Sequence, residues 1–197
     1  MRRWWGILLA CILLSACLRG GFFADGGSAS SDLPATDGGF DATVEDAGGF
    51  QYLYLEAESG ELVAPFAVRD DPQASGGKYL IDYAETTGGR TAGEARYTMT
   101  VLAAGTYQLW GRCRAPATDV DSFFIAVDDG PTTAYHTSTR GLSDDWTWTA
   151  VGTLEGAEVT PVTYTLGAGD HAIVLSSRES QAKIDRLLLT DDPSFTP

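Results

Sequence analysis

The sequence contains no asparagine and very little lysine. Lysine occurs only at Lys78 and Lys183 among 197 residues, and the absence of asparagine excludes N-linked glycosylation. The formal charge is −14, from 13 basic and 27 acidic residues. A protein that binds nucleic acid must supply lysine and arginine to displace the counterions of the phosphate backbone, so this composition argues against nucleic acid as a partner. It argues equally against a basic patch that would bind a membrane surface.

Sequence motifs of common catalytic sites are missing as well. The chain has no His-Glu-x-x-His zinc spacing, no Gly-x-Ser-x-Gly nucleophile turn and no phosphate-binding loop. Its two histidines are His171 and His136, and His136 lies in a threonine-rich loop where we expect it to be solvated. Paired carboxylates alone can hydrolyse a glycoside, but Asp128-Asp129 and Asp144-Asp145 are adjacent acids of the kind that turns use. The sequence therefore predicts a protein that is not an enzyme.

The first residues have the features of a bacterial export signal. Arg2-Arg3 precede a short apolar run, Ile7–Leu14, which is too short to span a hydrocarbon core as a helix. The run leads into Leu14-Ser15-Ala16-Cys17, which matches the bacterial lipobox. We expect residues 1–16 to be a lipoprotein signal peptide and Cys17 to carry the lipid, with an ordinary secretory signal as the alternative. The residue after the cysteine is not aspartate, which favours the outer membrane or cell surface, with membrane contact by the lipid anchor only.

Residues 17–50 read as a flexible tether. Paired glycines recur there with serine and aspartate between them, at Gly20-Gly21, Gly26-Gly27, Gly38-Gly39 and Gly48-Gly49. Such a segment cannot bury enough apolar surface to offset the entropy of ordering it. We therefore expect the folded domain to span residues 51–197.

The cysteines give no disulfide framework. Cys11 would leave with the signal and Cys17 would carry lipid, which leaves Cys113 without a partner. Because Cys113 lies in a strand-like segment, we expect it to be a small buried residue rather than a nucleophile.

From residue 51 onward the chain reads as a series of short strands. Glu94–Val101 alternates Ala95, Tyr97, Met99 and Val101 with polar residues, which is the period of a half-buried strand. The other predicted strands are Tyr107–Arg114, Asp121–Asp128, Val162–Leu166, His171–Ser176 and Lys183–Thr190. Asp121–Asp128 is apolar on both faces, as in a central strand. Many short strands separated by turn residues predict an all-β sandwich or barrel.

An ordered set of motifs resembles a known family. The segments are Leu55-Glu56-Ala57-Glu58, Ala74-Ser75-Gly76-Gly77-Lys78-Tyr79, Ala104-Gly105-Thr106-Tyr107-Gln108-Leu109-Trp110-Gly111-Arg112, Asp121-Ser122-Phe123-Phe124, Trp146-Thr147-Trp148, Leu166-Gly167-Ala168-Gly169-Asp170-His171 and Ile184-Asp185-Arg186-Leu187. In this order they resemble the carbohydrate-binding modules of families 6 and 35, within the galactose-binding-like group. The resemblance implies a jelly-roll β-sandwich of two antiparallel sheets.

Two glutamates suggest a cation site. Glu56 and Glu58 lie two residues apart, so on a strand both carboxylates would face the same side. Carboxylate and carbonyl oxygens are the ligands of Ca²⁺. From spacing alone, a solvated glutamate pair near arginine or lysine is the better interpretation. The family resemblance implies a structural calcium site whose ligands are Glu56, Glu58, Ser75, the Lys78 carbonyl and Asp185.

Sugar binding needs flat aromatic faces and a few polar groups that meet hydroxyls. The residues that we predict to bind ligand are Tyr83, Arg112, Asp121, Trp146, Trp148 and Glu179. Period two places Trp146 and Trp148 on one face, although both indoles fit a sandwich core as well, and Arg112 could instead pair with an acid. The family often uses asparagine for hydroxyl recognition, so its absence is a departure from the family pattern.

The predicted function is a non-catalytic, lipid-anchored carbohydrate-binding module with structural calcium. Its expected partner is a polysaccharide or oligosaccharide, and it would either work alone or serve a glycan-active enzyme in trans. The alternatives are a calcium-stabilised protein-interaction or structural module that binds no sugar, and a weak hydrolase.

Overall fold

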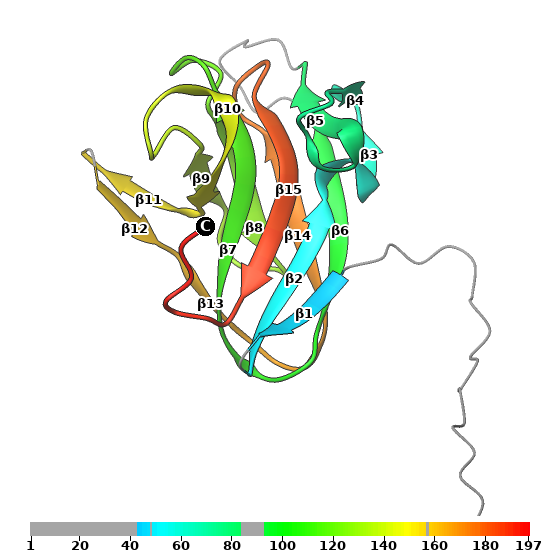
Figure 1. Ribbon diagram of the computed structural model, residues 1–197, viewed down its shortest axis with the longest axis vertical. Coiled ribbons are helices and arrows are strands. Elements are labelled where there is room, and N and C mark those ends of the chain that lie inside the picture. The colour runs from blue at the N-terminus through cyan, green and yellow to red at the C-terminus, as the bar shows by residue number, and fades with distance from the viewer. Residues whose placement is uncertain (1–42, 48, 84–92, 157) are drawn as a thin grey trace, which may run out of the picture. The chain divides into compact units, whose positions relative to one another are not determined.

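A computed structural model of the chain describes residues 43–47, 49–83, 93–156 and 158–197. The predicted signal peptide, Cys17 and the first part of the predicted tether lie outside these residues. The described residues fold almost entirely into antiparallel strands (Figure 1). No helix among them is long and apolar enough to cross a membrane.

The strands form two main sheets and a separate hairpin. The eight-stranded sheet contains β1 (Thr43–Ala47), β2 (Phe50–Glu56), β4 (Phe66–Asp70), β5 (Lys78–Asp82), β7 (Gly105–Ala115), β10 (Ser143–Ala150), β13 (Thr163–Leu166) and β15 (Lys183–Thr190). The five-stranded sheet contains β3 (Glu61–Val63), β6 (Glu94–Val101), β8 (Ser122–Val127), β9 (Thr133–His136) and β14 (Gly169–Ser177). The hairpin pairs β11 (Gly152–Glu155) with β12 (Glu158–Pro161).

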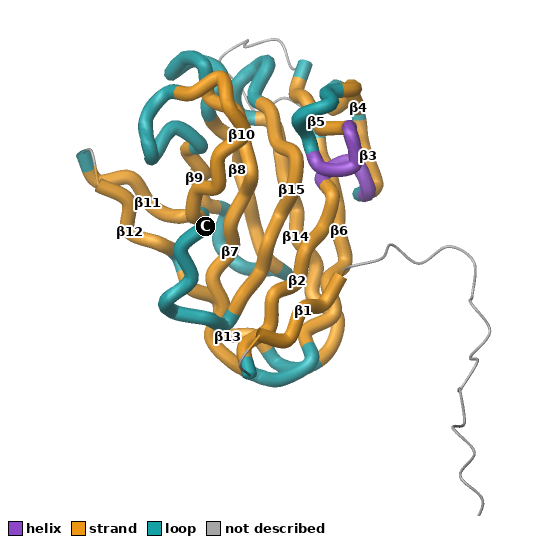
Figure 2. The backbone as a smooth tube through the Cα atoms, in the orientation of Figure 1, coloured by secondary structure: helices purple, strands orange, loops and turns teal. Residues whose placement is uncertain are grey.

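β15 is the central strand of the larger sheet. It pairs with β7 on one side, and with β2 and then β5 on the other. β10 and β13 continue the sheet beyond β7, and β1 and β4 lie at its outer edge. The smaller sheet has the order β3-β6-β14-β8-β9. Strands that are close in space are therefore often far apart in sequence, which is the jelly-roll sandwich that the sequence predicts (Figure 2).

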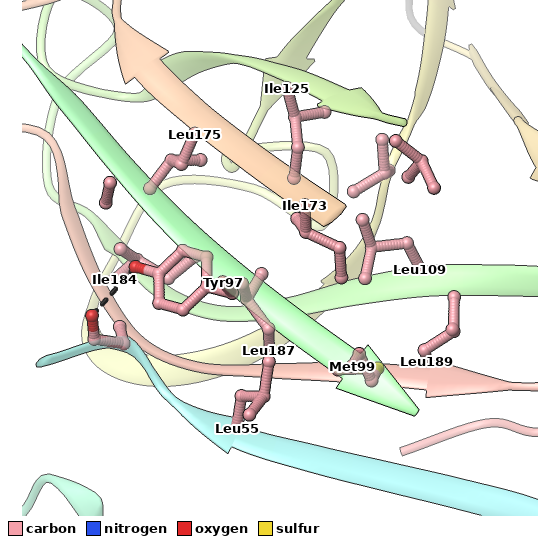
Figure 3. Packing of buried hydrophobic residues seen from close by; sticks show 14 of the residues in the cluster. Leu55, Tyr97, Met99, Leu109, Ile125, Ile173, Leu175, Ile184, Leu187 and Leu189 are labelled. Carbon is pink, nitrogen blue, oxygen red and sulfur yellow. Dashed lines mark hydrogen bonds between the residues drawn. The ribbon is translucent and has the colours of Figure 1, made fainter. Parts of the chain in front are cut away.

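The core forms between the inner faces of the two sheets. Alternation puts Tyr107, Leu109 and Cys113 of β7 in this core, so the free thiol of Cys113 is buried as expected. Residues from both sheets interdigitate there, among them Ile173 and Leu187 (Figure 3). The alternate residues of β7 lie on the opposite, outer face of the larger sheet, and this assignment decides where the candidate binding residues are.

The strand predictions from sequence hold well in the core and less well at the edges. The predicted limits of β6 and β15 agree with the structure, and β8 is an interior strand between β14 and β9. The structure differs at β1, which lies inside the segment predicted as a tether and pairs with β2. An edge strand gains backbone hydrogen bonds from its neighbour, so it needs no apolar alternation of its own.

Candidate functional site

The residues predicted to hold calcium come together where β2 pairs with β15. Glu56, the last residue of β2, lies opposite Arg186. Glu58 follows in the short 3-10 helix η1 (Ala57–Ser59). Ser75 begins the 3-10 helix η2 (Ser75–Gly77) and joins the two strands, because its hydroxyl donates to Glu56 Oε1 at 2.8 Å and its N–H donates to Asp185 Oδ1 at 2.8 Å.

A β-bulge in β15 turns two consecutive side chains toward the outer face. The register of β15 against β7 shifts between Ile184 and Arg186, which leaves Asp185 as the extra residue. Asp185 is completely buried and forms an ion pair with Arg112 of β7. Arg186 lies 2.9 Å from Glu56 Oε1, and its guanidinium carbon is 4.6 Å from the centre of the Tyr54 ring.

Glu56, Glu58 and Asp185 form a cluster that we call the acidic junction, and its negative charge is only partly neutralised. Glu56 Oε2 and Glu58 Oε2 are buried and have no hydrogen-bond partner among the described residues. Burial raises the pKa of Glu58, and the nearby charges of Glu56 and Asp185 raise it further. The positive charge of Lys78 lowers the pKa of Glu58. In the described part of the chain, no three Asp, Glu, His or Cys side chains are arranged as a preformed metal site.

The outer face of the larger sheet carries interleaved aromatic and arginine side chains at the end where β4 and β5 lie. We call this set the platform and define it as Tyr79, Tyr83, Trp146, Arg69 and Arg114. The Trp146 ring centre lies 5.3 Å from that of Tyr79 and 4.7 Å from the guanidinium carbon of Arg114. Arg69 is the cross-strand partner of Tyr79, and its guanidinium carbon lies 5.0 Å from the Tyr83 ring centre. Tyr83 is 43% exposed, so the platform reaches solvent at that end.

The orientation of Trp146 is fixed by polar contacts. Its indole N–H donates to Asp71 Oδ2 at 3.2 Å, and the same carboxylate oxygen forms an ion pair with Arg114 at 2.5 Å. The Gln73 side chain accepts a hydrogen bond from Arg114. A backbone hydrogen bond from Gln73 lowers the pKa of Asp71, with a further contribution from Arg114, so this anchor is ionised at neutral pH.

Trp148 and Arg112 lie on the same face but lower on the sheet. Trp148 is the register partner of Arg112, and its ring packs edge-on against Tyr54 at 6.1 Å between centres. Arg112 is committed to the buried Asp185, and its guanidinium carbon lies 6.0 Å from the Trp146 ring centre. Both predicted tryptophans are therefore outside the core and only partly exposed.

Two predicted ligand residues meet elsewhere, at the loop end of the sandwich. The N–H of Asp121 donates to Glu179 Oε2 at 3.0 Å, and the hydroxyl of Ser138 donates to Asp121 Oδ2. Burial raises the pKa of Asp121, while hydrogen bonds from Ser122 and from the Asp121 backbone lower that of Glu179 despite its own burial. His136 Nδ1 lies 3.7 Å from Asp121 Oδ1. Asp121 thus connects its own loop to the loops that contain Ser138 and Glu179.

Comparison with known proteins gives a fold match. No family model and no curated protein matches the chain. A family 35 carbohydrate-binding module from Clostridium thermocellum matches with a TM-score of 0.50 and 21% identity, over 69% of this chain and 96% of the module. The domain has the fold of a family 35 module. The GH26-CBM35 β-(1,4)-mannanase of Podospora anserina matches with a TM-score of 0.56 and 18% identity, over 74% of this chain and 29% of the enzyme. An exo-β-1,3-galactanase from Phanerochaete chrysosporium matches with a TM-score of 0.51 and 17% identity, over 69% of this chain and 28% of that enzyme.

Several residues of this family 35 fold that shape the outer face were not predicted from sequence. They are Arg69, Asp71, Gln73, Tyr79 and Arg114. The sequence did carry a signal: Arg112 and Arg114 lie two apart, and so do Trp146 and Trp148. This spacing puts two arginines on one face of one strand and two tryptophans on one face of another. The pairing of those rows was not visible, because β7 and β10 are adjacent only after the fold forms.

Proposed function

We propose that this domain is a non-catalytic carbohydrate-binding module that retains polysaccharide on the platform. Sugar rings present apolar C–H faces, which pack on aromatic rings, and hydroxyls, which bond to guanidinium, carboxylate and amide groups. The observation that carries the proposal is the fixed Trp146 ring, held by Asp71, Arg114 and Tyr79 beside the exposed Tyr83. A ring already held in place loses little side-chain entropy when ligand binds.

The carboxyl pair at the loop end supports a non-catalytic role. Asp121 is only 3% exposed, and its backbone N–H donates to Glu179 Oε2. A glycosidase holds its two carboxyl groups roughly 5–9.5 Å apart, with the scissile bond between them. A carboxyl group as buried as that of Asp121 cannot reach a scissile bond.

The first ligands to test are neutral polysaccharides. The structural neighbours include a β-1,3-galactanase and a β-(1,4)-mannanase, so β-1,3-galactan and β-1,4-mannan are the natural probes. Of the two platform arginines, Arg114 is already paired with Asp71, whereas Arg69 is exposed and contacts Tyr83.

Affinity electrophoresis in gels that contain these polysaccharides tests the proposal. Trp146→Ala should weaken retention by about 30-fold, the effect of losing a central contact of ~2 kcal/mol. Trp146→Phe should keep much of the retention, and Leu154→Ala, at an exposed site on β11, is the matched surface control. Unchanged retention in Trp146→Ala and Tyr83→Ala would contradict the platform. Failure of the unaltered domain to bind any glycan would favour a protein-interaction or structural module.

We also propose that the acidic junction binds structural calcium. The two unpartnered carboxylate oxygens of Glu56 and Glu58, with the Ser75 hydroxyl beside them, suit a hard cation. Asp185 can join only if it leaves Arg112, since its two oxygens already accept hydrogen bonds. The Lys78 carbonyl is the remaining predicted ligand. When bound, the ion would offset like charges and clamp the first long strand to the last.

Chelation should lower the melting temperature of the domain. Calcium at 100 times its Kd would contribute ~2.7 kcal/mol, which corresponds to roughly 5–10 °C for a domain of this size. Glu58→Gln should remove this calcium effect and should melt no lower than the chelated native protein, because it removes a desolvated charge. Glu61→Gln, on the exposed side of β3, is the control. A melting curve indifferent to calcium in the native protein would overturn the metal site.

Finally, we propose export and lipid anchoring at Cys17, supported by the lipobox. Cys17→Ser should abolish palmitate labelling of the chain in bacteria, and continued labelling would contradict this anchor.

A further inference from the structure

A pocket of about 390 Å³ opens at the end of the larger sheet opposite the Asp121–Glu179 loops. Its lining residues come from the starts of β2 and β7, from strand β13, and from the end of β15 and the segment that follows it. Figure 1 shows these elements at one end of the larger sheet. β7 has 11 residues and β15 runs antiparallel along it, so the two ends of the sheet are on the order of 30 Å apart. The pocket is therefore separate from both the loop end and the platform.

The lining of this pocket combines one aromatic ring with neutral polar groups. Phe50 is 38% exposed and forms an apolar wall. The side chains of Thr106, Gln108 and Thr163 also line the pocket, and none of them makes a hydrogen bond to another described residue. Asp191 uses one carboxylate oxygen to accept the N–H of Gln51 at 2.7 Å.

The wall beside these groups is held rigidly. Asp192 accepts hydrogen bonds from the Tyr52 hydroxyl at 2.6 Å, from Ser194 N–H at 2.8 Å and from the Ser194 hydroxyl at 2.7 Å. The Asp192 N–H donates to Thr190 Oγ1 at 3.1 Å. The segment after β15 is thereby fixed against the sheet, so the pocket is formed before any ligand arrives.

The charges around the pocket restrict the ligand. Its described lining contains Asp191 and Asp192 but no lysine, arginine or histidine. A phosphate or a uronate would meet like charge without a compensating cation. A neutral sugar unit matches the lining, because its C–H face can pack on Phe50 while Gln108 and the threonines meet its hydroxyls.

We propose that this pocket is a second saccharide site that binds one neutral sugar unit. The choice of ligand class rests on the proposed function, but the pocket uses no residue of the platform. With two sites at opposite ends of the sheet, one domain can hold two polysaccharide chains and cross-link them, and a surface that displays both chains gains avidity.

Calorimetric titration with β-1,3-galactotriose and a β-1,4-mannan oligosaccharide tests the second site. The native protein should bind two equivalents of at least one of these sugars. Phe50→Ala and Gln108→Ala should each weaken one of the two sites by about tenfold or more, whereas Phe50→Tyr should retain it. Trp146→Ala should remove only the other site. Phe50 is exposed at the start of a strand, so the fold should survive, and an unchanged melting temperature verifies this.

The outcomes separate the two proposals. A single site that is lost in Trp146→Ala and kept in Phe50→Ala would overturn the second site and leave the proposed function intact. A single site that is lost only in Phe50→Ala and Gln108→Ala would support the pocket and overturn the platform. No binding of either sugar would overturn both.

Discussion

His171 is held at both of its ring nitrogens by groups that can only accept a hydrogen bond. Nε2 lies 3.0 Å from the Gly167 carbonyl oxygen, and Nδ1 lies 2.8 Å from Asp128 Oδ2. With Asp128 ionised, both contacts are hydrogen bonds only when both nitrogens donate, so this geometry favours the imidazolium form. The hydrogen bond to Asp128 raises the pKa of His171, and the same bond lowers that of Asp128.

These shifts predict a pH dependence of stability with a definite sign. The contribution of His171 is complete below its unfolded pKa of about 6.5 and is lost as pH rises through its raised folded pKa. The contribution of Asp128 is present above its unfolded pKa and is lost on acidification. The free energy of unfolding in urea should therefore fall between pH about 5.5 and about 8.5. This fall should be smaller for His171→Gln and Asp128→Asn than for the native protein. Equal declines in all three would contradict the pair.

At the residue scale, the sequence predicted roles that depend on local setting. Cys113 is buried, as the surrounding strand indicated, and His171 contacts Asp128 and the Gly167 carbonyl. Arg112 illustrates the limit of such reasoning. Its partner Asp185 is 73 residues away, so alternation could place Arg112 on a face but could not reveal that the guanidinium is committed to a buried acid.

At the scale of elements, the core strands that face solvent on one side were predictable because burial imposes period two on their sequences. β6, whose burial alternates along its length, is the best example. The bulge at Asp185 was not predicted: it puts the core residues Ile184 and Leu187 three apart, but the apolar run that follows hides this break in the period. Short edge strands such as β3 and β1 follow backbone pairing rather than side-chain burial, so their sequences carry little signal. The platform spans β4, β5, β7 and β10 and depends on how these strands assemble.

The β7–β15 pairing gives a prediction about the acidic junction. Arg112→Ala should destabilise the domain by about 3 kcal/mol, because it leaves the buried Asp185 carboxylate without its partner. It should also strengthen calcium binding, since a carboxylate oxygen becomes available. Arg96→Ala, which breaks the exposed pair with Glu94, should change stability by less than about 0.5 kcal/mol. Chemical denaturation with and without calcium measures both effects, and equal losses in the two variants would refute the role of Arg112.

At the scale of the whole molecule, charge decides which polymers can approach. The chain carries a formal charge of −14, and two arginines on the outer face are paired with acids, Arg114 with Asp71 and Arg112 with Asp185, while Arg69 contacts Tyr83. Retention of neutral galactan or mannan should therefore not depend on salt, whereas polygalacturonate should be repelled at low ionic strength.

Affinity gels run with chelator at about 0.01 M and about 1 M salt check this prediction, because the Debye length falls from about 30 Å to about 3 Å over that range. Weak retention of polygalacturonate should rise with salt as the repulsion is screened. If polygalacturonate were instead held most strongly at low salt, guanidinium groups would have to be free to meet it. The exposed Arg69, which contacts Tyr83 rather than an acid, would be the first such group, and the platform would act as an anion site rather than a stacking surface.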